Sequence, residues 1–147
     1  MTATAPFAFT AAQQAMLDQA LGSGYGLWSG VRVVAAEPGW ARLAFQPRPE
    51  MLTPWGTLNG SVINGLLELP SWVALLTAME PDEFAVTNDF FLQHVRPLPG
   101  AVAYEMEGRL LRKGRTMAWT EATAFADGKP CSLARITTTL SRRPAQS

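Results

Sequence analysis

The segment most informative about the fold runs from Gly60 to Met79 and reads GSVINGLLELPSWVALLTAM. Its only charged side chain is Glu68, and apolar residues do not alternate with polar ones as they do in a half-buried strand. This pattern predicts one largely buried helix, roughly 30 Å long at about 1.5 Å per residue. Pro81 and Asp82 follow and end it, because a proline cannot continue a helix.

A short helix and a hairpin are predicted ahead of this long helix. Residues 10–13 read Thr-Ala-Ala-Gln, a capping box in which two side chains satisfy backbone amides at the start of a helix. That helix should end at the glycines of residues 22–24. Strands are expected over residues 31–36 and 41–46, joined by residues 37–40, where Pro followed by Gly favours a type II turn.

After the long helix the sequence predicts one strand after another. These strands are separated by turns rich in glycine and proline, and they cover residues 84–95, 101–111, 116–126 and 131–140. One buried helix and several antiparallel strands pack most economically as a single sheet over that helix. The predicted fold class is therefore α+β, with an antiparallel sheet of five to six strands wrapped around one long central helix, and a short helix at the N-terminus.

Length and composition are those of one globular domain. The chain has 147 residues, of which 48% are hydrophobic and 16% charged, so it holds enough apolar surface to form a core. We therefore expect a single domain over residues 1–147. Within it, residues 1–25 should form a helical lead and residues 142–147 a flexible tail.

Charge and cysteine content exclude several classes of protein. Twelve basic and twelve acidic side chains balance, so neither nucleic acid nor an anionic membrane surface is an expected partner. Cys131 is the only cysteine, which excludes an internal disulfide and favours a reducing compartment such as the cytoplasm. Residues 1–9 lack the basic start of a secretory signal, and no apolar run is long enough to span a bilayer. One histidine and one cysteine predict no metal site.

Two segments resemble a known protein family. Gly56-Thr-Leu-Asn-Gly-Ser61, with Glu68 further along the helix, resembles the thioesterase signature of hotdog proteins, in particular the phenylacetate-pathway and 4-hydroxybenzoyl-CoA thioesterases. That signature reads Gly-x-hydrophobic-His-Gly-Gly, with an acidic residue nine positions after the His, and Glu68 lies nine positions after Asn59. Residues 86–89 (VTND) and 95–97 (VRP) are similar to the family's strand after the helix.

The resemblance covers roughly residues 31–140 and implies the hotdog fold and a homo-oligomer, either a dimer or a tetramer. Three positions depart from the family pattern. The family's His is Asn59 here, its second Gly is Ser61, and the Asn or Gln that often precedes the His by six positions is Thr53. These departures lie in the catalytic signature, so they bear on the reaction more than on the fold.

The resemblance also implies catalytic roles. The Gly60 N–H would donate to the carbonyl oxygen of a thioester, since free amides at a helix N-terminus polarise such a group, while Asn59 also suits the ordinary role of an N-cap. Glu68 would act as a base or nucleophile. A solvent-facing Glu68, or one paired with an Arg across an interface, remains an alternative. The Thr87 hydroxyl would orient the attacking water and would come from a neighbouring subunit, whereas Glu68 and Gly60 would both belong to one subunit. Alternatively, Thr87 is simply a β-branched residue that suits its strand.

Further side chains are predicted to contact the substrate, namely Thr53, Ser61, Asn64, Trp72 and Arg115. Asn64 lies four residues before Glu68, at a spacing that favours a hydrogen bond between them. Trp72 either walls an acyl pocket or fills the core. Arg115, in a small basic turn, either meets the phosphates of coenzyme A or is a solvated tip. Pro70 should kink the helix just beyond Glu68.

These observations predict an acyl-CoA thioesterase-like hydrolase that acts on acyl-CoA or another acyl thioester. It needs no cofactor, because coenzyme A is part of the substrate. The departures at Asn59 and Ser61 leave a non-hydrolytic hotdog protein as the alternative, either an acyl-thioester or small-ligand binder or a dehydratase-like lyase. The lyase would need His94, the only histidine, to meet Glu68 across a dimer.

Overall fold

The computed structural model describes residues 7–143, and within them four α-helices, one 3₁₀ turn and six strands. The helices are α1 (Ala11–Gly22), α2 (Gly24–Ser29), α3 (Gly60–Leu66) and α4 (Glu68–Leu76), and the 3₁₀ turn is η1 (Pro49–Met51). The strands are β1 (Arg32–Glu37), β2 (Trp40–Phe45), β3 (Glu83–His94), β4 (Tyr104–Lys113), β5 (Met117–Ala126) and β6 (Lys129–Arg142). The predicted α+β class is confirmed.

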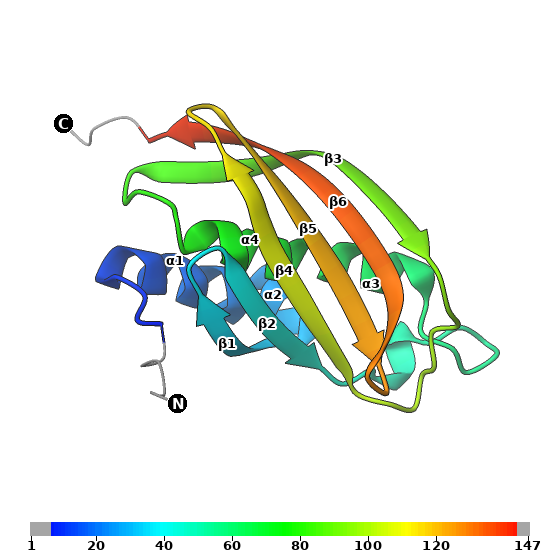
Figure 1. Ribbon diagram of the computed structural model, residues 1–147. Helices are drawn as coiled ribbons and strands as arrows, with labels where there is room; N and C mark the ends of the chain where they lie inside the picture. Colours follow the sequence, from blue (N-terminus) through cyan, green and yellow to red (C-terminus); the bar gives the residue numbers. More distant parts are fainter. Residues whose placement is uncertain (1–6, 144–147) are drawn as a thin grey trace, which may run out of the picture.

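All six strands form one antiparallel sheet in the order β1-β2-β4-β5-β6-β3. Figure 1 shows this sheet curving over α3 and α4, with β1 and β3 as its two edges. β3 directly follows the helices in the chain, yet it lies beside β6, where Thr87 pairs with Thr138 and His94 with Ser132. The inner face of β3 is thereby turned toward α3 and α4.

α3 and α4 form one helical rod that is interrupted at a single residue, Leu67. Pro70 accounts for the interruption, because it has no N–H to donate to the carbonyl of Leu66 four residues earlier. Pro70 itself lies in the first turn of α4, where proline is tolerated. The predicted kink just beyond Glu68 is therefore misplaced: the helix is interrupted immediately before Glu68, which becomes the first residue of α4.

The rod packs directly against the sheet. Its inward side chains, such as Ile63, Leu66 and Val73, are fully buried. On the sheet side, Gly108 of β4 lies so close to the rod that a Cβ there would overlap the carbonyl oxygen of Pro70. Truncating a side chain in such a close-packed core typically costs about 2–5 kcal/mol, so this packing fixes the rod, and Glu68 with it, relative to the strands.

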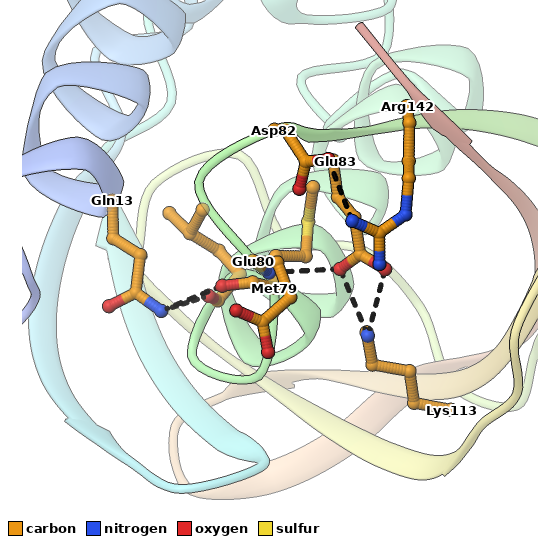
Figure 2. A network of polar contacts seen from close by, with 8 residues as sticks. Gln13, Met79, Glu80, Asp82, Glu83, Lys113 and Arg142 are labelled. Atoms are coloured by element: carbon orange, nitrogen blue, oxygen red, sulfur yellow. Dashed lines mark hydrogen bonds and ion pairs between the residues drawn. The ribbon is translucent and has the colours of Figure 1, made fainter.

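The C-terminal end of the rod is held by polar side chains (Figure 2). Gln13 of α1 donates from its side-chain amide to the carbonyl oxygens of Leu76 and Met79, at 2.9 and 3.3 Å. Carbonyl groups at a helix end have few donors within the helix, so α1 helps to cap α4 from outside. Figure 2 also shows the buried Glu83 carboxylate beside this end, bonded to Lys113.

Local sequence signals identify two further features correctly. The capping box between Thr10 and Gln13 is present in both of its hydrogen bonds. Gly39 has a φ of 74°, which is the backbone conformation that the second central residue of a type II turn requires. Both features depend on neighbouring residues alone, which is why the sequence predicts them.

Several boundaries differ from the prediction. The long helix ends at Leu76 instead of Met79, and the helical lead expected to end at residue 25 continues through α2 to Ser29. Arg142 belongs to β6, because it pairs with Glu83 across the ladder, so the predicted tail at 142–147 is wrong at its first residue. The rest of that tail beyond residue 143, and residues 1–6 of the lead, lie outside the described residues.

Candidate active site

Glu68 begins α4 directly after the interruption of the rod. Its half-buried carboxylate accepts a hydrogen bond from the Thr87 hydroxyl on the inner face of β3. Across residues 7–143, no Lys, Arg or His forms an ion pair with it. Glu68 is therefore neither free in solvent nor paired with an Arg of its own chain. A carboxylate held by a hydroxyl alone keeps free lone pairs, which a general base or a nucleophile needs.

A cavity of about 160 Å³ lies beside this carboxylate. Apart from Glu68, its walls are mostly apolar or carry hydroxyl groups, and they include Trp72, Ala85, Thr87 and Thr138. Trp72 lines the cavity and also packs on the hydrophobic core, so its position fits both of the roles considered for it. Three larger hollows, of about 450, 300 and 200 Å³, are more open and include neither Glu68 nor Thr87.

Tyr25 of α2, which the sequence does not single out, also lines this cavity. Its hydroxyl lies against Gly65, where a Cβ would overlap it. Burial raises the pKa of Tyr25, and the negative charge of Glu68 raises it further, so the phenol stays a hydrogen-bond donor at neutral pH. Gly65 is the one sequence signal for this contact. A glycine inside a helix is unfavourable, and it is needed here because a side chain would overlap the Tyr25 hydroxyl.

The start of the rod presents a free backbone amide. Gly60 is the first residue of α3, so its N–H has no acceptor inside the helix, and no described residue accepts a hydrogen bond from it. Asn59 is the N-cap, and its Oδ1 accepts hydrogen bonds from the Ser61 N–H at 2.9 Å and from the Ser61 hydroxyl at 2.7 Å. Two positions that depart from the family signature thus form the cap that holds the free amide in place.

The structure reverses the expected grouping of the catalytic residues. Glu68 lies eight positions after Gly60, which is about 12 Å along a helix axis at 1.5 Å per residue. This separation is long for two groups that act on one reacting carbonyl, so it favours a site to which two chains contribute. Thr87, expected from a neighbouring subunit, bonds Glu68 of its own chain.

Two predicted substrate contacts lie outside the cavity. Asn64 is exposed, and its side chain makes no hydrogen bond to Glu68, so the expected hydrogen bond between these two residues is wrong. The helix break at Leu67 lies between these two residues, which disturbs the four-residue spacing of a regular helix. Thr53 bonds the Thr57 hydroxyl at 2.8 Å within the loop that precedes the rod.

Arg115 lies in the turn between β4 and β5, and Lys113 at the base of this turn pairs with Glu83 at the start of β3. Gly60 lies at the opposite end of β3, where His94 ends the strand. Arg115 and the free amide are therefore far apart within one chain. The predicted contact of Arg115 with coenzyme A phosphates stays a prediction.

Other chemistries find little support among the described residues. Burial raises the pKa of the Cys131 thiol, which disfavours the thiolate that a cysteine nucleophile needs. Within residues 7–143, no group of three or more His, Cys, Asp or Glu side chains is placed to hold a metal ion. None of the helices in that part of the chain is long and apolar enough to cross a membrane.

No protein-family model matches this chain, and no curated protein matches it in sequence. Solved structures do match it. A thioesterase from Haemophilus influenzae is 19% identical with a TM-score of 0.80, covering 97% of this chain and 96% of that one. A variant of the phenylacetic acid degradation protein PaaI from Thermus thermophilus is 23% identical with a TM-score of 0.69, covering 77% and 95%. A Streptococcus mutans protein bound to acetyl-CoA is 18% identical with a TM-score of 0.68, covering 77% and 90%.

These matches establish the class to which the fold belongs. The chain has the hotdog fold, in which a curved antiparallel sheet wraps a central helix, and the solved structures that share this fold include thioesterases. The resemblance noted from residues 56–61 and Glu68 is thereby confirmed for the fold. At identities near 20% the reaction has to be argued from the site itself.

Proposed function

We propose that this protein is an acyl-CoA thioesterase-like hydrolase, in which Glu68 acts as the base or nucleophile. The observation that carries the proposal is the Glu68 carboxylate, which faces a cavity, is bonded by the Thr87 hydroxyl and forms no ion pair within residues 7–143. As a base, Glu68 takes a proton from water, which attacks the thioester carbonyl. As a nucleophile, it attacks the carbonyl carbon itself and forms an anhydride that water then hydrolyses. In either route the thiolate of coenzyme A leaves.

The cavity beside Glu68 supports an acyl group as the occupant. Its volume of about 160 Å³ suits a ring or a short chain better than a long one, and Trp72 and Tyr25 give it flat apolar walls. The Tyr25 hydroxyl adds a donor to the hydroxyl groups that Thr87 and Thr138 already contribute to the wall. The neighbour that binds acetyl-CoA supports a coenzyme A thioester as the substrate class.

A second copy of the chain would complete the site. β3 is an edge strand of 12 residues with exposed apolar side chains, among them Phe91 at 61%. Such an edge readily pairs with another strand. Antiparallel pairing of β3 with β3 of a second copy would set two helical rods side by side in opposite directions. The Gly60 amide of one copy would then approach the Glu68 carboxylate and the Thr87 hydroxyl of the other.

This assembly predicts a particular pattern of subunit complementation. Mixing inactive Glu68→Gln chains with inactive Gly60→Val chains should restore activity, because each mixed dimer has one intact site. Mixing Glu68→Gln with Thr87→Val should restore nothing, because both residues serve the same site from one chain. Sedimentation at micromolar concentration should give a mass well above the 15.9 kDa of one chain. A monomer, or equal recovery in both mixtures, would contradict the assembly.

The direct test of the function is release of free thiol from a panel of acyl-CoAs with short, long and aromatic acyl groups. We expect turnover for at least one member and none after Glu68→Gln. Binding without turnover would instead support the acyl-thioester binder. The same assembly would bring His94 toward Glu68, as a lyase requires, so hydration of an enoyl-CoA should be followed in parallel, and hydration without thiol release would support the lyase.

The cytoplasm remains the expected compartment. Cys131 is free and buried, and a free thiol with no disulfide is typical of proteins from a reducing compartment. Acyl thioesters of coenzyme A are also substrates of that compartment. Fractionation of cells that express the tagged full chain would test this expectation.

A further inference from the structure

His94 lies at the end of β3, and its ring is held in place. Along the inner face of β3, Phe90 and Leu92 pack on the core, and His94 continues their alternation. Its Nδ1 lies 2.8 Å from the hydroxyl of Ser132, its partner on β6, and Ser132 is completely buried. A hydrogen bond to a buried strand residue fixes the orientation of the imidazole, so its other nitrogen points in a defined direction.

That other nitrogen points at the start of the helical rod. The Nε2 of His94 lies 3.1 Å from the position that a Cβ on Gly60 would take. The imidazole therefore lies directly beside Gly60, where a side chain on residue 60 would press against it. The Gly60 N–H has no partner among the described residues. Two hydrogen-bonding groups, one from the backbone and one from a side chain, thus lie side by side at this point.

We propose that His94 is a further catalytic residue, whose Nε2–H binds the thioester carbonyl oxygen beside the Gly60 N–H. This inference rests on the proposed thioesterase function and adds a second donor to its oxyanion site. When the Ser132 hydroxyl donates to Nδ1, the proton of the neutral ring lies on Nε2, which is the tautomer that this role requires. When a C–O bond forms at the carbonyl carbon, the π electrons move to the oxygen, and both donors stabilise that charge. The electrons return as the C–S bond breaks, and His94 keeps its proton throughout.

The same arrangement accounts for the missing histidine of the family signature. Asn59 stands at that position, and its side-chain carbonyl is occupied by Ser61 in capping the helix. The imidazole of this chain instead reaches the same helix start from β3. In this chain, therefore, the imidazole beside Gly60 is supplied by β3 and not by residue 59.

Three variants test the proposal in the full chain. His94→Phe removes both ring nitrogens and keeps a flat ring, and it should lower kcat for thiol release by about a hundredfold, the usual effect of losing one oxyanion donor, with little change in KM. His94→Gln keeps a side-chain N–H and should lose clearly less. Gln93→Phe places the same ring on the adjacent residue, which faces the other side of the strand, and should leave kcat unchanged.

A spectroscopic measurement separates this inference from the proposed function. Benzoyl-CoA labelled with ¹³C at the thioester carbonyl is bound to the Glu68→Gln protein, in which turnover is blocked. Hydrogen bonds to the oxygen polarise the carbonyl and move its resonance downfield. Adding His94→Phe should move that resonance back toward the value of free benzoyl-CoA, whereas adding Gln93→Phe should not.

Two results would overturn the role of His94. One is a His94→Phe protein that keeps its kcat while Glu68→Gln loses activity, which leaves the thioesterase function intact. The other is a carbonyl resonance that His94→Phe does not move. If the wild-type chain releases no thiol at all, the proposed function fails, and the carbonyl resonance still decides whether His94 binds the thioester.

Discussion

Glu68 and Glu83 lie at opposite ends of α4, and their carboxylates have different partners. The Glu83 side chain is only 5% exposed, lies 2.9 Å from the Lys113 ammonium, and accepts a hydrogen bond from the Glu80 N–H at 2.9 Å. Glu68 accepts a hydrogen bond from the Thr87 hydroxyl and faces a cavity. One carboxylate is matched by a cation and an amide, and the other is left available to a ligand.

This difference separates a structural carboxylate, Glu83, from the carboxylate that we propose takes part in the reaction, Glu68. Burial by itself raises the pKa of Glu83, but the Glu80 N–H and the Lys113 ammonium more than offset it, so the pKa lies below its usual value. Glu83 therefore stays ionised and stabilises the junction of α4 and β3. Charge on a buried residue is costly unless it is paired, so a half-buried carboxylate that pairs with no described cation, such as Glu68, is a candidate for a functional role.

The largest expected difference between the two glutamates is in turnover. Glu68→Gln keeps the size of the side chain but removes the base or nucleophile, so kcat should fall by at least about a hundredfold. Glu83→Gln is the matched control and should keep the rate per folded molecule within about twofold. Thiol release, corrected for the folded fraction by circular dichroism, checks both. Similar losses in the two variants would remove the distinction between them.

The next effect concerns the hydroxyl that bonds Glu68. Thr87→Val keeps the β-branched shape that suits a strand and removes the hydrogen bond to the carboxylate. A hydrogen bond to a charged group contributes about 1.5–3 kcal/mol, so kcat should fall by about tenfold to a hundredfold. Thr87→Ser retains the hydroxyl and should keep most of the rate. A Thr87→Val protein with full activity would mean that Thr87 serves only the strand.

Stability should respond in the opposite order. Glu83→Gln leaves the Lys113 ammonium without its partner and should lower the free energy of unfolding by about 1–3 kcal/mol. Glu68→Gln should change it by less than about 1 kcal/mol, because no cation depends on that carboxylate. Urea titrations measure both values. Adding Lys113→Met to Glu83→Gln should recover part of the loss, and no recovery would argue against the ion pair as its source.

The smallest effect is a pH dependence of stability. Because the folded-state pKa of Glu83 lies below the ordinary value of 4.5, its contribution is complete above about pH 4.5 and is lost as the pH falls through the folded-state pKa. Urea midpoints between pH 3 and 7 should therefore fall less steeply on the acid side for Glu83→Gln than for the wild type. Identical acid limbs in the two proteins would show that Glu83 has no part in this dependence.

Features that depend on neighbouring residues were predictable from the amino-acid sequence alone. The capping box at Thr10, the turn at Gly39 and the long apolar helix with one charge at Glu68 belong to this group, because each depends on a run of residues and on backbone geometry. The same run also drew attention to Glu68, because burying a single charged side chain in an apolar helix costs free energy unless the charge is paired or has a function. Composition and order of elements then pointed to one sheet over one helix.

Which of these residues meet is a property of the tertiary structure. β3 pairs with β6 at the edge of the sheet, and this pairing brings Thr87 to Glu68 of the same chain and His94 to Gly60. No local pattern encodes strand order, because the partners lie far apart in sequence and are chosen by the packing of the whole sheet on the rod. The grouping of the site residues into two separate places, one at the start of the rod and one at its interruption, follows from that packing.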